Sequence, residues 1–345
     1  MSPDTAALEV LSAGFHTTVQ DLGRHGFQNL GVPVSGALDS LSLRVANGLL
    51  GNDEGSACFE ILYHGPTFRV LRGSVRIALS SGSVQIPDDP ELTIDGGRSV
   101  SLREGQSFRL VCPGTLACCY LAVQGGLLLE PLLGSQSTFV RGGFGGFQGR
   151  QLRAGDVVPL RRSTAASQDE VQLKHPLPDR LHDPIRVVLG PQSEFFTGPA
   201  IAAFLSEEFG ISGSSDRMGM RLDGPRIAHR DGYNIVSDGI ATGAIQVPGS
   251  GQPVVLLADH QTTGGYPKIG GVISADVPAV GRRRVGGRIR FKAVSLQEAV
   301  LGRREQEQAL VRAIATRGPV APAVGVDVDA LYSANLVSGV ENGIE

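Results

Sequence analysis

Two stretches of the sequence, EILYHGPTFRV at residues 60–70 and GMRLDGPRIAH at residues 219–229, each place a Gly-Pro pair after a short apolar run. The two pairs are 159 residues apart (224 − 65). A second match follows in the same order, with GSVQIP at residues 82–87 and GAIQVP at residues 243–248, and its offset is 161 (243 − 82). Similarity at a nearly constant offset is typical of a duplicated unit. The sequence therefore predicts two related domains.

The ends of the two copies also match, because RAGDVVPL at residues 153–160 resembles RVGGRIRF at residues 284–291. The offset here falls to 131 (284 − 153). The first copy therefore carries about 30 additional residues, for which the glycine-rich stretch near residues 130–150 is the candidate insertion. The predicted organisation is a first domain at 1–163, a linker at 164–184, a second domain with a closing helix at 185–317, and a tail at 318–345 that we expect to be mobile.

Short β-branched and apolar runs, separated by Gly, Pro, Asp and Ser, dominate both copies. Such runs are typical of strands joined by tight turns, so the predicted fold class is mainly β. Capping residues and helical spacing indicate a few helices among the strands. The expected helices run from Asp39 to Leu50 with Gly51 as the stop, from Thr197 to Phe209 with Gly210 as the stop, and from about Ser295 to Arg317.

The composition excludes several classes of protein. The chain has 345 residues, a net charge of −3, 41% hydrophobic residues and no tryptophan. A nearly neutral chain with few aromatic residues is not typical of nucleic-acid binding. No basic and apolar leader is visible at the N-terminus, and no apolar run approaches the ~18 residues of a membrane span. We therefore expect a soluble, cytoplasmic protein that binds neither nucleic acid nor membranes.

The four cysteines show no spacing typical of a metal site. Cys118 and Cys119 are adjacent in an apolar run, so in a strand they would face opposite sides. Buried free thiols are the simpler interpretation, and a reactive or bridged pair is the alternative. The sequence alone does not decide their redox state.

Three glycine-flanked polar clusters are candidates for function: TTVQDLGRHG at residues 17–26, SDRMGMRLDG at residues 215–224, and ADHQTTGGYPKIGG at residues 258–271. The third follows an apolar strand, so its polar side chains would lie on a loop at a strand end, where functional residues concentrate. Familiar sites are absent, since no phosphate-binding GxxxxGK[ST] loop, HExxH zinc motif, GxSxG elbow or Met-flanked biotinyl lysine occurs.

The third cluster has the composition of an anion site. The hydroxyl groups of Thr262 and Thr263 and the backbone N–H groups of Gly264 and Gly265 can hold an anionic oxygen. Lys268 is one of only three lysines in a chain that otherwise uses arginine, which favours a specific need for a compact ammonium group. We expect Lys268 to lie exposed on this loop.

Simpler interpretations exist for the other charged residues. Asp21 with Arg24, and Asp216 with Arg217, could be ion pairs that fix turns. Asp39 is explained by its role as a helix cap. A single histidine is more often a satisfied core or surface residue than a catalyst.

Six ordered motifs give the sequence a specific resemblance: TTVQDLGRHGFQNLGVPVSGALD, ANGLLGN, LGSQST, SDRMGMRLDG, GAIQVPGSGQPVVLLADHQTTGGYPKIG and RFKAVSLQEA. Over roughly residues 8–300 they resemble the biotin-dependent carboxyltransferase-like family. This family includes the carboxyltransferase part of urea amidolyase and the C subunit of bacterial 5-oxoprolinase, formerly called allophanate hydrolase subunit 2. The sequence departs from the family pattern at Arg282, where Gln is expected, and at Val285 and Gly286-Gly287, where Pro and Gly-Asp are expected.

The resemblance implies two cyclophilin-like β-barrel domains. It also implies a subunit of an ATP-dependent 5-oxoprolinase that opens 5-oxo-L-proline to L-glutamate. The expected partners are a smaller cyclophilin-like subunit and a third, hydrolase-like subunit, with ATP and Mg²⁺ at a shared site and no biotin attached to this chain. One alternative is a carboxyltransferase for urea or another amide, served by a separate biotin carrier. The other is a non-enzymatic regulatory partner of a small cyclophilin-like kinase inhibitor.

Residue type and motif position together nominate the site. For catalysis and proton handling the candidates are Lys268, Asp216, Asp259 and Tyr266. For contacts with the substrate or an anion they are Arg24, Asp21, Arg217, Thr262, Thr263, Gly264 and Gly265. No metal ligands are expected within the chain.

Overall fold

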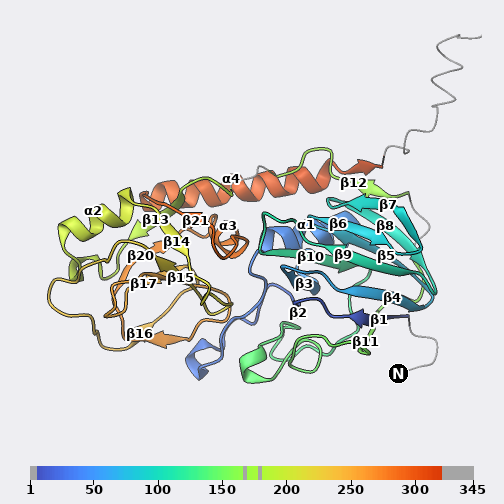
Figure 1. The fold of residues 1–345 in the computed structure, drawn as a ribbon, viewed down its shortest axis with the longest axis horizontal. Coiled ribbons are helices and arrows are strands. Elements are labelled where there is room, and N and C mark those ends of the chain that lie inside the picture. The colour runs from blue at the N-terminus through green and yellow to red at the C-terminus, as the bar shows by residue number, and fades with distance from the viewer. Residues whose placement is uncertain (1–5, 166–168, 178–180, 321–345) are drawn as a thin grey trace, which may run out of the picture.

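The computed structural model describes residues 6–165, 169–177 and 181–320. The predicted tail at 318–345 lies outside the described residues apart from its first three positions. The chain is mainly β, as predicted, and forms two barrel-like units side by side (Figure 1). In the described part of the chain, no helix has the length and apolar character needed to cross a bilayer.

Two antiparallel sheets pack face to face to form the first barrel. One sheet has the order β11 (Val157–Pro159), β1 (Ala7–Ser12), β4 (Thr67–Arg72), β9 (Ser107–Val111), β6 (Ser83–Ile86) and β7 (Asp89–Asp95). The other has the order β2 (His16–Gln20), β3 (Cys58–Leu62), β10 (Cys118–Val123), β5 (Ser74–Leu79), β8 (Arg98–Arg103), β12 (Val171–Gln172) and β23 (Gly318–Pro319). β12 lies within the predicted linker at 164–184 and pairs with β8 on one side and with the edge strand β23 on the other.

Strand β10 shows how alternation builds two cores. Cys119, Leu121 and Val123 face the interior of the first barrel, whereas Cys118 and Tyr120 face the core shared with the second barrel. All six residues of β10 are buried, so this strand is covered on both faces. The prediction that the two adjacent cysteines face opposite sides is confirmed.

The second barrel is an eight-stranded sheet, with neighbours in the order β21 (Arg288–Ile289), β14 (Phe209–Ile211), β15 (Gly219–Asp223), β18 (Val254–Leu256), β17 (Ala244–Gln246), β20 (Lys268–Val272), β13 (Ile185–Leu189) and β22 (Phe291–Ala293). β21 and β22 form its two edges, and only Arg290 separates them in the sequence. The sheet therefore curls until its edges nearly meet. A separate two-stranded ribbon joins β16 (Asp238–Gly239) and β19 (Thr263–Gly264).

Local chemistry accounts for the helix ends. In α1 (Ser40–Leu50), the carboxylate of Asp39 accepts hydrogen bonds from the first-turn N–H groups, and Gly51 ends the helix with φ +67°. The prediction for α2 (Gly198–Ser206) was wrong at its C-terminal end, which was expected at Phe209. Phe209 instead begins β14 and pairs with Ile289, because sheet pairing places its ring in the core. A short helix α3 (Val277–Gly281) lies between the barrels.

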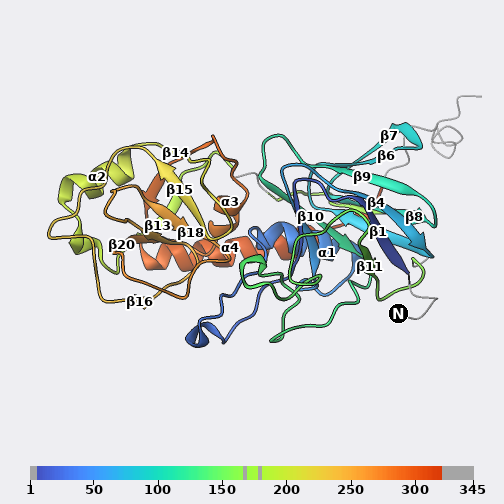
Figure 2. The same cartoon turned by 60° about the horizontal axis from the view of Figure 1, so that its bottom comes forward.

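Helix α4 (Leu296–Ala315) begins at a capping box made by Ser295 and Glu298 and runs along both barrels (Figures 1 and 2). Glu307 binds Arg44 of α1 with two hydrogen bonds, at 2.8 and 2.5 Å. Near its end, Ile314 packs directly on Gly48 of α1. The chain then enters β23, which pairs with β12 of the first barrel. Residues that follow the second barrel in sequence therefore complete the first.

Candidate functional site

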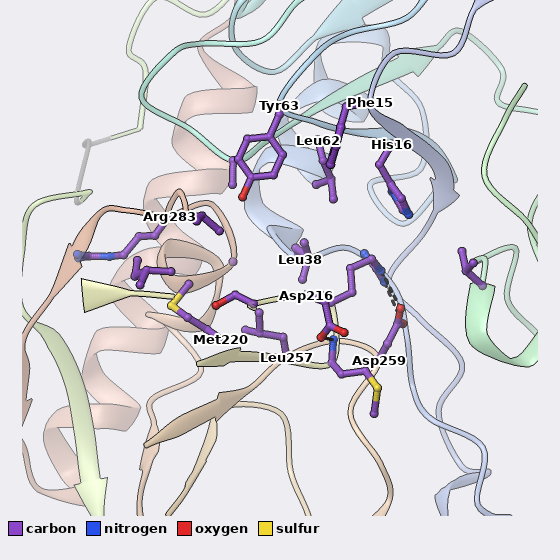
Figure 3. A pocket seen from close by; sticks show the side chains of 18 of the residues that line it. Phe15, His16, Leu38, Leu62, Tyr63, Asp216, Met220, Leu257, Asp259 and Arg283 are labelled. Carbon is purple, nitrogen blue, oxygen red and sulfur yellow. Dashed lines mark hydrogen bonds and ion pairs between the residues drawn. The ribbon is translucent and has the colours of Figure 1, made fainter. Parts of the chain in front are cut away.

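A cavity of about 520 Å³ lies where the two barrels meet. The first barrel contributes residues around the start of β2 and the end of β3, among them Phe15, His16 and Tyr63 (Figure 3). The second barrel contributes residues from segments 211–220, 257–259 and 281–285. Val140 and Arg141 of the glycine-rich stretch complete the lining. The walls are mostly apolar, with a few charged groups among them.

Arg217 forms a buried ion-pair network on one side of this cavity. Its Nε and Nη2 atoms donate to the two carboxylate oxygens of Asp259 at 2.8 and 3.0 Å, and Nη1 donates to Glu60. Nη2 also donates to the backbone oxygen of Gly36 at 2.7 Å. Burial opposes the charged form, but Asp259 and Glu60 outweigh it and raise the pKa of the Arg217 guanidinium.

Glu60 connects this network to the first barrel. Its second oxygen accepts hydrogen bonds from the Tyr120 hydroxyl at 2.6 Å and from the Leu38 N–H at 2.8 Å. Burial, and to a lesser degree the nearby Cys118 and Glu60, raise the pKa of Tyr120, so the hydroxyl stays protonated and donates its hydrogen bond. The network therefore ties β3 and β10 to the second barrel. The contact between Arg217 and a substrate or anion stays a prediction. In the structure, the nitrogens of Arg217 already bind protein groups on both barrels.

His16 is a cavity residue that the sequence analysis missed. Its Nδ1 atom is buried and has no hydrogen-bond partner among the described residues. Figure 3 shows the ring on the first-barrel wall, across the cavity from the labelled Asp259. Burial, and to a lesser degree the charge of Arg217, lowers the pKa of His16 against the opposing effect of Glu60 and Asp259. The imidazole is therefore neutral at pH 7 and able to accept a proton. In the sequence, the only indication that His16 has a functional role is its position directly before the TTVQD motif.

Asp216 lines the same cavity and also fixes a turn. Its Oδ1 atom accepts hydrogen bonds from the N–H groups of Met218 at 2.8 Å and Gly219 at 3.2 Å. It also lines an adjoining hollow of about 360 Å³, where Tyr266 and Arg141 are found. The structure therefore brings Asp216, Arg217 and Asp259 to one cavity, and Asp216 and Tyr266 to the hollow beside it.

Asp21 and Arg24 organise the glycine-rich stretch. The Asp21 carboxylate accepts hydrogen bonds from the Ser135 hydroxyl at 2.7 Å and from the Gln136 N–H at 2.6 Å, so it is held in place. Arg24 is 1% exposed, stacks over the Phe144 ring at 5.0 Å, and donates from Nη2 to the Ser137 carbonyl. Its Nε and Nη1 atoms have no partner in the described residues. Burial lowers the pKa of this arginine, although Asp21 opposes the shift.

The expectation that Lys268 is exposed was wrong. The residue is 4% exposed and begins the inner strand β20, where its Nζ atom lies 3.0 Å from Asp238. The pKa of Asp238 is lowered, mainly because its carboxylate accepts the hydrogen bond from Lys268. Thr263 and Gly264 form β19, which pairs with the strand that carries Asp238. Thr262 and Gly265 flank this ribbon, and their carbonyls accept hydrogen bonds from Ile240 and Ile235. Lys268 is not among the residues that line the two hollows.

Two expectations about metals and thiols can be compared with the structure. Over the described ranges, no three His, Cys, Asp or Glu residues are grouped so that they could hold a metal ion. All four cysteines are buried and free, as the simpler interpretation predicted.

The family assignment rests on comparison with known proteins. The profile of the family described as carboxyltransferase domain, subdomain A and B, matches residues 30–293. The chain belongs to this family. The solved Kluyveromyces lactis urea carboxylase superposes with a TM-score of 0.81 at 29% identity, over 90% of this chain and 29% of that one. The mainly β fold with barrel domains, predicted from the resemblance, is thereby confirmed.

Two kinds of curated relatives share this carboxyltransferase-like domain. The 5-oxoprolinase C subunit of Escherichia coli is 36% identical over 301 residues, which cover 87% of this chain and 96% of the relative. The urea amidolyase of Lachancea kluyveri is 31% identical over 327 residues, covering 88% of this chain but only 18% of that much longer protein. The match therefore spans nearly the whole of the first relative and less than a fifth of the second.

Proposed function

We propose that this chain is a subunit of a 5-oxoprolinase complex and that the cavity between its barrels holds the lactam. The similarity to the 5-oxoprolinase C subunit over almost the full length of that relative supports the assignment. The reaction would consume ATP and two water molecules and release L-glutamate, ADP and phosphate. A lactam is a poor electrophile, so its opening needs activation of the amide oxygen and precise placement of the attacking water.

The single observation that carries this proposal is that His16 lies on the wall of a mostly apolar cavity, where burial keeps its imidazole neutral. An imidazole in that state can take a proton from a water molecule as the water attacks the activated lactam carbon. The apolar walls suit the ring carbons of the substrate.

Arg283 lines the cavity, but its guanidinium is turned away from the other lining side chains (Figure 3). The residue is 7% exposed, and its Nη1 and Nη2 atoms donate to the backbone oxygens of Arg288 and Asp183 at 2.7 Å each. Its Nε atom is buried and has no partner in the described part of the chain. The guanidinium therefore fixes the cavity wall and is not presented to a ligand.

ATP and Mg²⁺ belong to the same proposal, as does a site shared with partner subunits. When bound, ATP would supply the phosphoryl group that activates the amide oxygen. Arg141 fits phosphate, since it is exposed, lines both hollows, and forms no ion pair with another described residue. The predicted partners, a smaller cyclophilin-like subunit and a hydrolase-like subunit, would provide the remaining phosphate contacts.

The test is reconstitution with the two expected partner subunits, followed by measurement of ADP release that depends on 5-oxoproline. We expect little release from the isolated chain and clear release from the complex. His16→Gln should lower the turnover of the complex about 100-fold or more, as expected for loss of a general base. The matched control His25→Gln, an exposed histidine, should keep normal turnover. Strong lactam-dependent ATP cleavage by the isolated chain, or a stable complex without any turnover, would refute the proposal.

A second candidate is a biotin-dependent carboxyltransferase that acts on urea or a related amide. The superposition with urea carboxylase over 90% of this chain favours it. The same preparations, given a carboxylated biotin carrier and urea, distinguish the two functions, because only a carboxyltransferase would transfer labelled carboxylate to urea. A complex that assembles tightly but shows neither reaction would instead support the regulatory-partner alternative.

A further inference from the structure

Cys112 and Cys119 place their sulfur atoms 3.0 Å apart inside the first barrel. Cys112 directly follows β9 of one sheet, and Cys119 belongs to β10 of the facing sheet. Both side chains lie in the interior core of this barrel, where Cys112 is 9% and Cys119 0% exposed. A disulfide bond is about 2.05 Å long, so the two sulfurs need to approach by only about 1 Å.

The two thiols are chemically unequal. The hydrogen bond with Cys119 lowers the pKa of Cys112, and the charge of Arg284 acts in the same direction against burial. The same hydrogen bond, together with burial, raises the pKa of Cys119. Cys112 is thus both the more exposed residue of the pair and the one that more readily forms a thiolate. A reactive thiolate beside a second thiol that can resolve it is the usual composition of a redox site.

The pKa values of the other two cysteines are shifted in the opposite direction from that of Cys112. Burial raises the pKa of Cys58 and of Cys118. Cys118 faces the opposite side of β10 from Cys119, in the core shared with the second barrel. Its sulfur lies 3.9 Å from the carbonyl oxygen of Gly281. These two thiols therefore serve as internal controls within the same chain.

We propose that Cys112 and Cys119 form a reversible intramolecular disulfide, with a hydroperoxide as the oxidant. The Cys112 thiolate attacks one oxygen of hydrogen peroxide; the O–O bond breaks, hydroxide takes up a proton, and a sulfenic acid forms. The Cys119 thiol then attacks the sulfur of Cys112; the S–S bond forms, the S–O bond breaks, and water leaves with the thiol proton. The two thiols are oxidised by two electrons, and the peroxide is reduced to two waters.

The bridge would close a short loop that contacts the second barrel. Gly114 accepts a hydrogen bond from Arg284 at 2.6 Å, and the N–H of Ala117 donates to the carbonyl of Arg282 at 2.8 Å. Ala117 also lines the cavity between the barrels. Oxidation would therefore fix a segment that forms part of the cavity wall. This inference does not depend on the proposed enzymatic activity.

Differential alkylation of the full chain tests the proposal. The protein is treated with hydrogen peroxide, denatured with excess N-ethylmaleimide, and weighed by mass spectrometry, with and without subsequent reduction by dithiothreitol. We expect two alkylated thiols, Cys58 and Cys118, and a chain that has lost two hydrogens; reduction after alkylation should release two further thiols, those of Cys112 and Cys119. Four alkylated thiols after oxidation, or oxygen adducts without a bridge, would refute the proposal.

Cys112, Cys118 and Cys119 lie on one tryptic peptide, residues 110–141, so the mass of that peptide does not show which two of them are bridged. Cysteine variants make this assignment. Cys118→Ala and Cys58→Ala should still lose two hydrogens on oxidation. Cys112→Ser and Cys119→Ser should not, and a thermal melt confirms that each is folded. If Cys118→Ala abolished the bridge, or if Cys112→Ser still formed one, the assignment to this pair would be wrong.

Discussion

Removing the guanidinium of Arg217 should destabilise the protein strongly. In Arg217→Met, the carboxylates of Glu60 and Asp259 would remain buried, at 0% and 6% exposed, without the cation that neutralises them. Breaking a buried ion pair by removing one partner costs roughly 3–5 kcal/mol. For a domain of this size, that corresponds to a fall in Tm of roughly 6–20 °C.

The assay is thermal unfolding at pH 7, followed by circular dichroism and calorimetry on the wild type and on two variants. The matched control is Arg288→Gln, because Arg288 pairs with Glu208 while 72% of its side chain is exposed to solvent. That exposed pair is worth at most about 1 kcal/mol. The reasoning would be refuted if Arg217→Met melted within about 2 °C of Arg288→Gln, since burial would then confer no special cost. Adding Glu60→Gln to Arg217→Met should recover part of the loss, because it removes one uncompensated charge.

Three further predictions follow from single contacts. Lys268→Ala should lower Tm, because it removes a buried ammonium that pairs with Asp238, whereas the exposed Lys292→Ala should not. Equal melting temperatures of the two variants would contradict this. Burial lowers the pKa of His16 in the folded state, so the unfolded chain binds a proton first as the pH falls through 6.5. The free energy of unfolding should therefore decline over that range, and it should decline less in His16→Gln. Identical pH profiles of the two proteins in chemical denaturation would contradict this. Gly48→Ala should lower the free energy of unfolding by about 1–3 kcal/mol, because the new Cβ would lie 2.7 Å from the Ile314 side chain. Adding Ile314→Val should recover part of that loss in thermal melts. An unchanged Tm in Gly48→Ala would contradict the close packing of α1 and α4 at this point.

Local chemistry is what the sequence states most clearly about this fold. Asp39 and Thr197 were recognised as helix caps because a cap acts on N–H groups two or three residues away. Phe209 was assigned to the wrong element for the opposite reason. Its conformation is set by pairing with Ile289, 80 residues later (289 − 209), which no local pattern reports.

The same distinction governs the candidate site. Arg217 was predicted to contact a substrate or an anion. Its partner Glu60 lies 157 residues earlier in the other barrel, so the sequence could not show that the guanidinium already binds protein carboxylates. Lys268 looked exposed because glycine and threonine surround it in sequence. The β16–β19 ribbon instead folds over it and brings Asp238 to its ammonium group. His16 was missed because nothing near it in the sequence marks its Nδ1 atom as free.

The pairing of β12 with β23 also bears on how the protein is made by the ribosome. Residues 171–172 leave the exit tunnel long before residues 318–319, with the entire second barrel translated between them. At 5–20 residues per second, the nascent first barrel would wait roughly 7–30 s with β12 lacking its outer neighbour. An unpaired sheet edge of that duration is a surface on which chaperones act and on which nascent chains associate. Slowing translation within the second barrel should therefore lower the yield of soluble protein, although the amino-acid sequence stays the same.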